Sequence, residues 1–313
     1  MADRLARTLS ADGTVRGLAA VTTELVEEAR VRHGTLPTAT AALGRALTAG
    51  LLLGGLSKAD ERVSLQWSGD GPLGSILVDA TPGGHVRGFV SRPQTHLPAR
   101  AGKLDVGGAV GRGVLCVMRI PLGEASPYRS IVPLVSGEIG TDVASYLAAS
   151  EQIPSVVGVG VFVHADGRVG AAGGYLLQAM PGADAGAIDR LEENVGAAPP
   201  PSDLVRQGLD APAILARLLA GFPTRVLEEQ PLRFQCRCSR ERVEAAIVAM
   251  GRGELLDVLA HERRAEVVCE FCGAIDSFLD EVVIDDKGGR MFVCSDTDYC
   301  DKRRAADDKD AAE

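Results

Sequence analysis

The cysteines are distributed very unevenly along this chain. Of the seven cysteines in 313 residues, six lie between Cys236 and Cys300. They begin with two close doublets, Cys236-Arg-Cys238 and, after 30 further residues, Cys269-Glu-Phe-Cys272. Each doublet can offer two thiolates to one tetrahedral metal ion, and two such doublets are improbable among unrelated buried thiols. The spacing therefore predicts a metal or redox site. An all-thiolate set favours zinc or iron, of which zinc is the commoner in structural sites.

The single residue between Cys236 and Cys238 makes the first doublet unusual, because the cysteine pairs of zinc sites normally have two to four intervening residues. Thiolates held this close together by a metal are good targets for peroxide. Their oxidation would destroy the ligand set, release zinc and remove the roughly 10–16 kcal/mol of apparent binding free energy that such sites contribute to folding. We therefore expect this part of the chain to unfold on oxidation and to expose apolar surface.

Charge and hydropathy exclude several classes of protein. The formal net charge of −9 argues against a general nucleic-acid binder, which normally carries a basic surplus. Met1–Ala11 lacks the apolar segment of a secretory signal. The most apolar stretch, Ala46–Leu56, is shorter than the roughly 20 residues that span a membrane. We expect a cytoplasmic protein without membrane attachment, in a reducing compartment where cysteines persist as thiols or metal ligands.

Residues 1–181 predict an α+β core domain of mixed strands and helices. One helix is expected to start after Thr22 or Thr23, and another to run from Thr38 to Leu56 with glycines that permit close packing. Helices inserted early among strands that later run as hairpins favour α+β over a doubly wound sheet. The expected strands, rich in Val, Ile and Leu and bounded by Gly or Pro turns, are Val15–Val21, Val63–Ser68, Ser75–Asp79, His85–Val90, Val114–Ile120, Val156–His164 and Ala171–Met180.

Residues 182–235 predict a helical linker. Apolar residues recur at helical spacing in Ala187–Val195 and Leu204–Leu219, on either side of a Pro199-Pro200-Pro201 break. Helices with so few apolar residues need a partner surface, so we expect the linker to lie on the core domain. While the C-terminal metal site is folded, six apolar side chains of this segment need to be covered. They are Ile188, Leu191, Val195, Leu204, Leu215 and Leu218.

Residues 236–300 predict a small zinc-binding redox-switch domain. A helix capped by Ser239 would carry Val243, Ile247 and Met250 as a narrow apolar stripe. So small a core normally needs a staple such as a metal. The last residues, 301–313, have no apolar side chain larger than alanine and predict a disordered tail.

Many short motifs, in order over residues 4–272, resemble the 33-kDa chaperonins, which are redox-regulated heat-shock chaperones. The motifs include Pro37-Thr38-Ala39, Gly71-Pro72-Leu73-Gly74, Val135-Ser136-Gly137-Glu138-Ile139-Gly140, Ser150-Glu151-Gln152-Ile153-Pro154-Ser155, Gln178-Ala179-Met180-Pro181-Gly182 and Cys236-Arg-Cys238-Ser239. The resemblance implies an ATP-independent holdase that binds unfolded client proteins and is inactive with zinc bound. It also implies that oxidation pairs Cys236 with Cys238 and Cys269 with Cys272, unfolds the switch and linker, and favours a homodimer.

The last part of the chain departs from this family. Cys269, Cys272, Cys294 and Cys300 are spaced as at the end of the iron–sulfur subunit of carbon–phosphorus lyase, which this tail of about 40 residues resembles. That resemblance implies a cluster held by the first three cysteines and radical chemistry at the fourth. An iron–sulfur or radical enzyme fragment is therefore the alternative to a chaperone. We expect Cys294 and Cys300 to be additional thiols outside the zinc site, beyond a hairpin of Val282–Ile284 and Arg290–Val293.

The rest of the sequence offers no catalytic site. Glycine-rich stretches such as Gly170–Gly174 lack the lysine of a phosphate-binding loop, and the five histidines are scattered. Ser136 lacks the Gly-x-Ser-x-Gly setting of a hydrolase nucleophile. Cys116, among apolar neighbours, is expected to be a small buried side chain. We therefore assign no catalytic residue and expect a protein that is not an enzyme.

Overall fold

The structure, a computed structural model, describes residues 2–59, 61–121, 126–239, 249, 253, 267–273, 275–276, 279–283 and 290–294. It divides into two compact units, Met1–Cys236 and Arg237–Glu313. The helices are α1 (Thr23–His33), α2 (Pro37–Gly54), α3 (Val106–Val110), α4 (Gly140–Ser150), α5 (Ala185–Ala197), α6 (Pro201–Arg206) and α7 (Ala211–Leu218). The strands of the first unit are β1 (Arg4–Ser10), β2 (Val15–Val21), β3 (Glu61–Gly69), β4 (Ser75–Ala80), β5 (His85–Val90), β6 (Gly113–Pro121), β7 (Tyr128–Pro133), β8 (Ser155–Val163), β9 (Val169–Ala179), β10 (Thr224–Pro231) and β11 (Arg233–Phe234).

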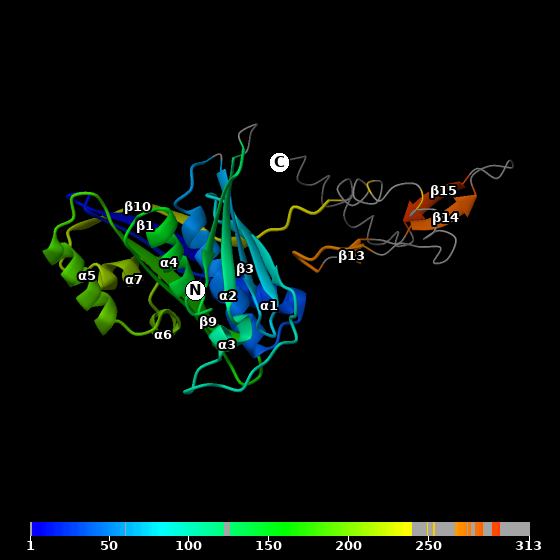
Figure 1. Ribbon diagram of the computed structural model, residues 1–313, viewed down its shortest axis with the longest axis horizontal. Coiled ribbons are helices and arrows are strands. Elements are labelled where there is room, and N and C mark those ends of the chain that lie inside the picture. Colours follow the sequence, from blue (N-terminus) through cyan, green and yellow to red (C-terminus); the bar gives the residue numbers. More distant parts are fainter. Residues whose placement is uncertain are drawn as a thin grey trace. The chain divides into compact units, whose positions relative to one another are not determined.

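Two sheets form the framework of the first unit (Figure 1). One has the order β10-β1-β2-β9-β8 and the other β11-β5-β4-β3-β6-β7. Neighbouring strands are antiparallel, except that β11 pairs with β5 in parallel. Helices combined with antiparallel sheets are the α+β class, so the predicted fold class is confirmed.

Helix α2 provides the centre of the core. It begins with Pro37 at its first turn, and nearly all of its side chains are buried. A Cβ on Gly44 would lie 2.8 Å from Val161 of β8, and one on Gly50 would lie 2.6 Å from Val78 of β4. Both distances are far below van der Waals contact. The helix therefore approaches one strand of each sheet, and only glycine fits at these two positions, as the sequence predicted.

The helices within residues 182–235 cover the first sheet. Leu191 of α5, Leu204 of α6 and Leu215 of α7 share a buried apolar cluster with residues of β2 and β9. Asp184 and Asp210 accept hydrogen bonds from backbone N–H groups three residues on and so cap α5 and α7. The predicted covering of this segment's apolar side chains is therefore confirmed for those three leucines. The prediction that 182–235 forms a linker separate from the core stays a prediction.

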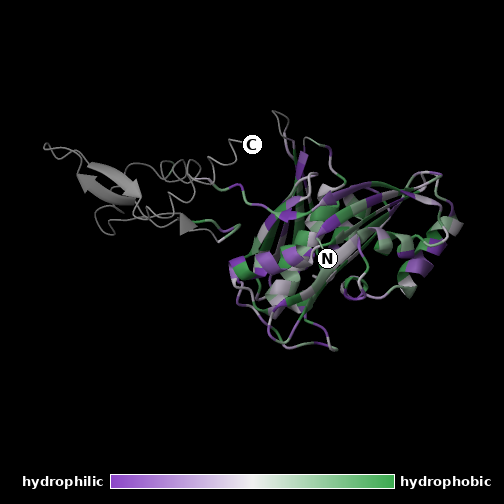
Figure 2. Cartoon of the chain, turned by 180° about the vertical axis from the view of Figure 1, so that it is seen from behind, coloured by the Kyte–Doolittle hydropathy of each residue, from purple (hydrophilic) through white to green (hydrophobic). Residues whose placement is uncertain are grey.

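Two of the six apolar side chains that we expected to be covered are not fully buried. Val195 is only partly buried against the cluster, whereas the prediction for Ile188 is wrong, since it is 39% exposed. Ile188 lies in the first turn of α5, outside the buried cluster that Leu191 joins and that Val195 packs against. Hydrophilic and hydrophobic residues are interspersed along α1 and α5 (Figure 2). A residue's place on such a mixed helix depends on the angle at which the helix packs, which its spacing does not determine.

The seven predicted strands are confirmed to within two residues at each end. The sequence analysis missed β1, β7, β10 and β11 of the first unit, and it also missed α3 and α4. Strand β1 carries Arg4 and Arg7, which obscure its apolar pattern, and Arg7 forms an ion pair of 3.3 Å with Glu228 of β10. Strand β10 thus depends on a pairing across more than 200 residues of sequence.

The second unit is described in part. Strands β12 (Val267–Val268) and β13 (Ile275–Asp276) pair, as do β14 (Leu279–Val283) and β15 (Arg290–Cys294). The predicted hairpin is therefore confirmed, with its first strand starting at Leu279. The predicted helix after Ser239 and the tail 301–313 lie outside the described residues, apart from isolated positions.

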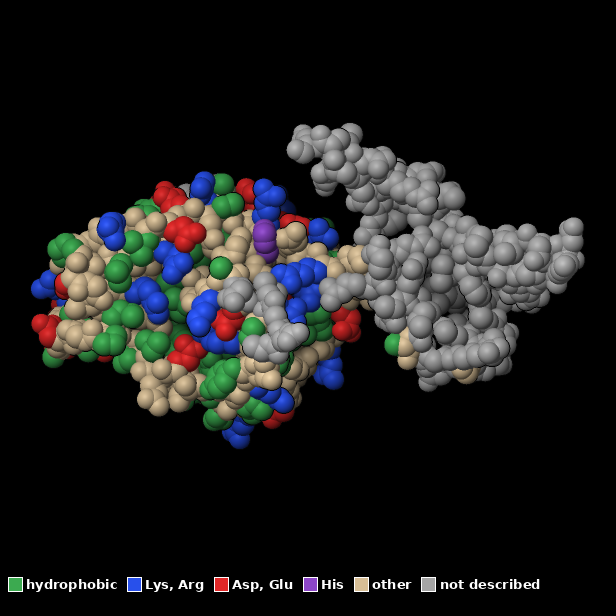
Figure 3. Space-filling view, turned by 90° about the horizontal axis from the view of Figure 1, so that it is seen from above, with side chains coloured by type: hydrophobic (Ala, Val, Ile, Leu, Met, Phe, Trp, Pro, Cys, Tyr) green, Lys and Arg blue, Asp and Glu red, His purple; other side chains and the backbone are tan. Residues whose placement is uncertain are grey.

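Two observations bear on the classes of protein that the sequence argues against, nucleic-acid binders and membrane-spanning proteins. On the face of the first unit shown in Figure 3, basic and acidic side chains are interspersed and form no continuous basic surface. Among the described residues, no helix has both the length and the apolar character needed to cross a membrane. The domain boundaries predicted at residues 181, 235 and 300 stay predictions.

Candidate metal centre

The structure brings together the four cysteines that the spacing singled out. The sulfur atoms of Cys236, Cys238, Cys269 and Cys272 all lie within 4.8 Å of one another. The sulfurs of Cys238 and Cys272 are 3.5 Å apart, well beyond a disulfide bond of about 2.05 Å. Four sulfurs at about 2.3 Å from a tetrahedral zinc ion lie about 3.8 Å from each other. The observed separations bracket this value, so the four thiols fit a tetrahedral metal ion.

A tight turn positions the second doublet. The backbone N–H groups of Cys272 and Gly273 both donate to the carbonyl oxygen of Cys269, at 3.2 and 2.8 Å. Gly273 has a φ of 68°, in the left-handed region that glycine adopts without strain. This turn follows β12 directly. It places both thiols on the same side of the chain, and Cys272 is buried while Cys269 is half-buried.

A parallel strand positions Cys236 at the end of the first unit. Arg233 and Phe234 of β11 pair with His85 and Val86 of β5, and Gln235 N–H donates to the Val86 carbonyl at 2.8 Å. The chain that leads into the first doublet is therefore an added edge strand of the six-stranded sheet.

One ion pair of that sheet contacts Cys236 through its arginine. Arg87 of β5 forms an ion pair of 2.7 Å with Asp79, its partner on β4, and its Nη1 lies 3.9 Å from the Cys236 sulfur. Burial lowers the pKa of Arg87, but the hydrogen bonds to Asp79 and Cys236 raise it by more, so the guanidinium stays charged. Sequence reasoning missed both residues. The turn between β4 and β5 was a signal for their pairing, but nothing in the sequence indicated a contact with Cys236.

The three remaining cysteines are Cys116, Cys294 and Cys300. Cys294 ends β15 opposite Leu279, and Cys300 lies outside the described residues, so the expectation that both are additional thiols stays a prediction. Cys116 lies on β6 with 6% of its surface exposed, which confirms the predicted burial. It also accepts a hydrogen bond of 3.3 Å from Nε of Arg129, a contact that its apolar sequence neighbours did not indicate.

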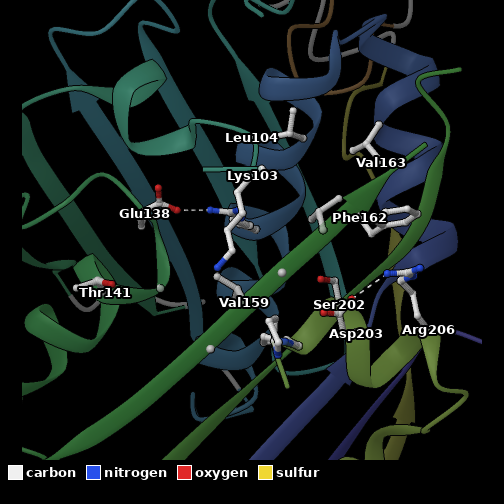
Figure 4. Close-up of a pocket in the computed structure, with 18 of the residues that line it drawn as sticks. Lys103, Leu104, Glu138, Thr141, Val159, Phe162, Val163, Ser202, Asp203 and Arg206 are labelled. Carbon is white, nitrogen blue, oxygen red and sulfur yellow. Dashed lines mark hydrogen bonds and ion pairs between the residues drawn. The ribbon is translucent and has the colours of Figure 1, made fainter. Parts of the chain in front are cut away.

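A cavity of about 690 Å³ in the first unit runs along β8 (Figure 4). Its floor is a row of valines from β8. Around its rim Glu138 pairs with Arg45, and Asp203 pairs with Arg206. The lining residues that the structure describes include neither Cys nor His.

Comparison with known proteins decides between the two resemblances. A family model described as Hsp33 protein matches residues 3–278. The chain belongs to the Hsp33 family. A second model, described as phosphonate metabolism protein PhnJ, matches only residues 252–306. The Hsp33 match includes all four clustered cysteines, so the resemblance to the 33-kDa chaperonins is confirmed and the likeness to PhnJ is a minor addition at the end of the chain.

Relatives named 33 kDa chaperonin support the same assignment. The one from Geobacter sulfurreducens is 45% identical over 279 residues, covering 89% of this chain and 93% of the relative. That from Symbiobacterium thermophilum is 49% identical over 286 residues, covering 91% and 97%. The crystal structure of the 33 kDa chaperonin from Thermotoga maritima superposes with a TM-score of 0.82 at 36% identity, covering 88% of this chain and 94% of that one. Chaperonin names agree with the prediction that the chain is not an enzyme.

Proposed function

We propose that this chain is an ATP-independent holdase, switched on by oxidation of a zinc centre formed by Cys236, Cys238, Cys269 and Cys272. The observation that carries the proposal is the meeting of these four thiols within 4.8 Å in a chain of the Hsp33 family. The holdase would bind unfolded client proteins during heat and oxidative stress. It would act in the cytoplasm, where a reducing thiol pool keeps the switch off.

The proposed metal is one zinc ion per chain. Thiolates are soft ligands that suit zinc, copper(I) and iron–sulfur clusters, and a closed set of four protein ligands is typical of structural zinc. When bound, zinc would supply folding free energy of about 10–16 kcal/mol. The four thiols contribute the complete ligand set from the chain itself. They leave no position for substrate, which is consistent with a switch and not with a catalytic metal.

The proposed switching chemistry is a pair of two-electron oxidations. In each doublet the two thiolates would give two electrons to hydrogen peroxide: an S–S bond forms, the O–O bond breaks, and with two protons from the solvent two waters are released. One disulfide would join Cys236 to Cys238 and the other Cys269 to Cys272. Neither disulfide sulfur is a good zinc ligand, because the thiolate is the ligating form. The second unit then loses its main source of stability.

The proposed client surface is the apolar area that the switch keeps covered. Leu191, Leu204 and Leu215 are buried against the first sheet. Their release would expose both the helices' apolar faces and the strands beneath. Exposed apolar patches of this kind bind partners or drive association, which would also favour a homodimer of the oxidised chain.

The test is suppression of aggregation, followed by light scattering as a client protein unfolds on heating. Reduced, zinc-loaded protein should leave the client's aggregation unchanged. The same protein after peroxide and mild heat should suppress it at a near-stoichiometric ratio, with no ATP present. Reduction with a thiol in the presence of zinc should restore the inactive state. Equal suppression by reduced and oxidised samples would exclude the redox switch while leaving a constitutive chaperone.

A further inference from the structure

We propose that Arg87 is a positioning residue of the four-cysteine centre: its guanidinium donates to the sulfur of Cys236 and holds that thiol within the ligand set. The inference rests on the proposed thiolate centre and adds to it one residue that is not a metal ligand. Arg87 lies on β5, about 150 residues before Cys236 in the sequence, and its Nη1 is 3.9 Å from the Cys236 sulfur. Both residues belong to the first unit.

Asp79 orients this guanidinium. Nε and Nη2 of Arg87 both donate to Oδ2 of Asp79, at 3.1 and 2.7 Å. The side chains of the pair are only 13% and 14% exposed. Because the guanidinium is planar and its N–H groups form a rigid fork, anchoring one edge on Asp79 determines where Nη1 points. The remaining edge of the guanidinium carries Nη1, which donates to the sulfur of Cys236.

The backbone brings Cys236 to this edge and keeps it there. In the parallel register Phe234 lies opposite Val86, so Cys236 comes alongside the residues that follow Val86 on β5. Phe234 is 8% exposed and lies under the guanidinium of Arg32, 5.4 Å from the ring centroid. Ladder hydrogen bonds and this buried ring therefore anchor the strand just before the first cysteine.

Charge supplies the reason for an arginine at this place. Four thiolates around a divalent cation carry a formal net charge of −2, which is costly in a partly buried site. A guanidinium that donates to one thiolate offsets part of that charge and fixes the direction of the sulfur's remaining lone pairs. Outer partners of this kind orient metal ligands, and their loss typically lowers metal affinity 10–100-fold. A lysine would keep the charge but lose the fork that Asp79 orients.

The experiment measures zinc affinity by competition with a chromogenic chelator in reduced, full-length protein. Arg87→Met should lower zinc affinity 10–100-fold, and Arg87→Lys should lower it less. Arg129→Met is the matched control, because Arg129 also donates to a cysteine sulfur, at 3.3 Å from Cys116, outside the cluster. It should leave zinc affinity unchanged. Visible absorption of the Co(II)-substituted centre should change with Arg87→Met and not with Arg129→Met, since it reports ligand geometry.

A double variant separates positioning from folding. Arg87→Met alone leaves Asp79 buried and unpaired, which destabilises the core. Asp79→Asn with Arg87→Met removes both charges, so core stability should recover while zinc affinity stays low. Wild-type zinc affinity in the double variant, or an equal loss in Arg129→Met, would overturn the role of Arg87. Wild-type protein without zinc would instead overturn the proposed centre itself, so the two failures are distinguishable.

Discussion

Asp3 caps the first helix from outside it. Its carboxylate accepts hydrogen bonds from the backbone N–H groups of Leu25 at 2.6 Å and Glu24 at 3.2 Å, at the positive end of α1. Burial nevertheless raises the pKa of Asp3 to about 6, because the cost of desolvating the charge exceeds the stabilisation from these hydrogen bonds. The folded protein therefore holds this proton more tightly than the unfolded chain does.

This difference makes the stability of the core depend on pH. The contribution of Asp3 is fully present below about pH 4, the unfolded pKa, and is lost as pH rises to about 6, the folded pKa. The free energy of unfolding should therefore fall by up to about 3 kcal/mol across this window. Asp3→Asn should flatten the slope, measured by urea denaturation of zinc-loaded protein at several pH values in that window.

Asp12→Asn provides the control for this measurement. Hydrogen bonds from Ser10 and Thr14 lower the pKa of Asp12, so its contribution is lost only at lower pH and the slope should persist in this variant. An unchanged slope in Asp3→Asn would show that another group is responsible.

The sequence predicted some residues of the candidate metal centre and not others. The spacing of Cys236, Cys238, Cys269 and Cys272 was sufficient to single them out, because a metal site needs several ligands in close doublets. Arg87 was not recognisable, because its role depends on the pairing of β11 with β5, two strands far apart in the sequence. A partner of this kind has no local pattern that distinguishes it from any other strand arginine.

Among the elements, α7 has the most direct bearing on switching. Leu218 of α7 is fully buried in the apolar cluster between the helices and the first sheet. Leu218→Ala should cost about 2–5 kcal/mol of helix docking and so release this surface without oxidation. We expect the reduced, zinc-loaded variant to suppress client aggregation partially. Ile188→Ala, at a side chain that is 39% exposed, is the matched control and should behave as wild type.

Zinc content distinguishes the possible causes in this experiment. The Leu218→Ala protein should still carry its zinc, because Leu218 belongs to an apolar cluster of the first unit that includes none of the four cysteines. No gain of activity in the reduced variant would show that the helices do not cover the client surface. Activity gained only with loss of zinc would place the effect in the metal centre instead.

Strands in which apolar and polar residues alternate were predictable from the sequence. Strands that lack this alternation were not. In β4 buried and half-buried residues alternate strictly, and the sequence located this strand within one residue. In β10 almost every residue is exposed, so no period identifies it, and only pairing with β1 makes it a strand. The ion pairs of its two glutamates with Arg4 and Arg7 of β1 were recognisable only once that register was known.

At the scale of the whole molecule, a two-sheet core is followed in the chain by a small unit for which we propose a metal-dependent fold. The core has a large apolar interior around α2. The described part of the second unit consists of short strands and a turn that carries two ligands. In the proposed switch, oxidation would therefore act on the second unit, while the core would stay folded and present the client surface.

The pairing of the cysteines after oxidation tests this account most directly. Protein purified without oxygen should contain one zinc per chain and neither iron nor sulfide. After peroxide, peptide mapping by mass spectrometry should find Cys236 joined to Cys238 and Cys269 joined to Cys272, with the zinc released in proportion. A variant with Cys294 and Cys300 changed to Ser should give the same pairs. Dominant links from Cys269 or Cys272 to Cys294 or Cys300, or iron and sulfide in the purified protein, would contradict the four-cysteine zinc switch.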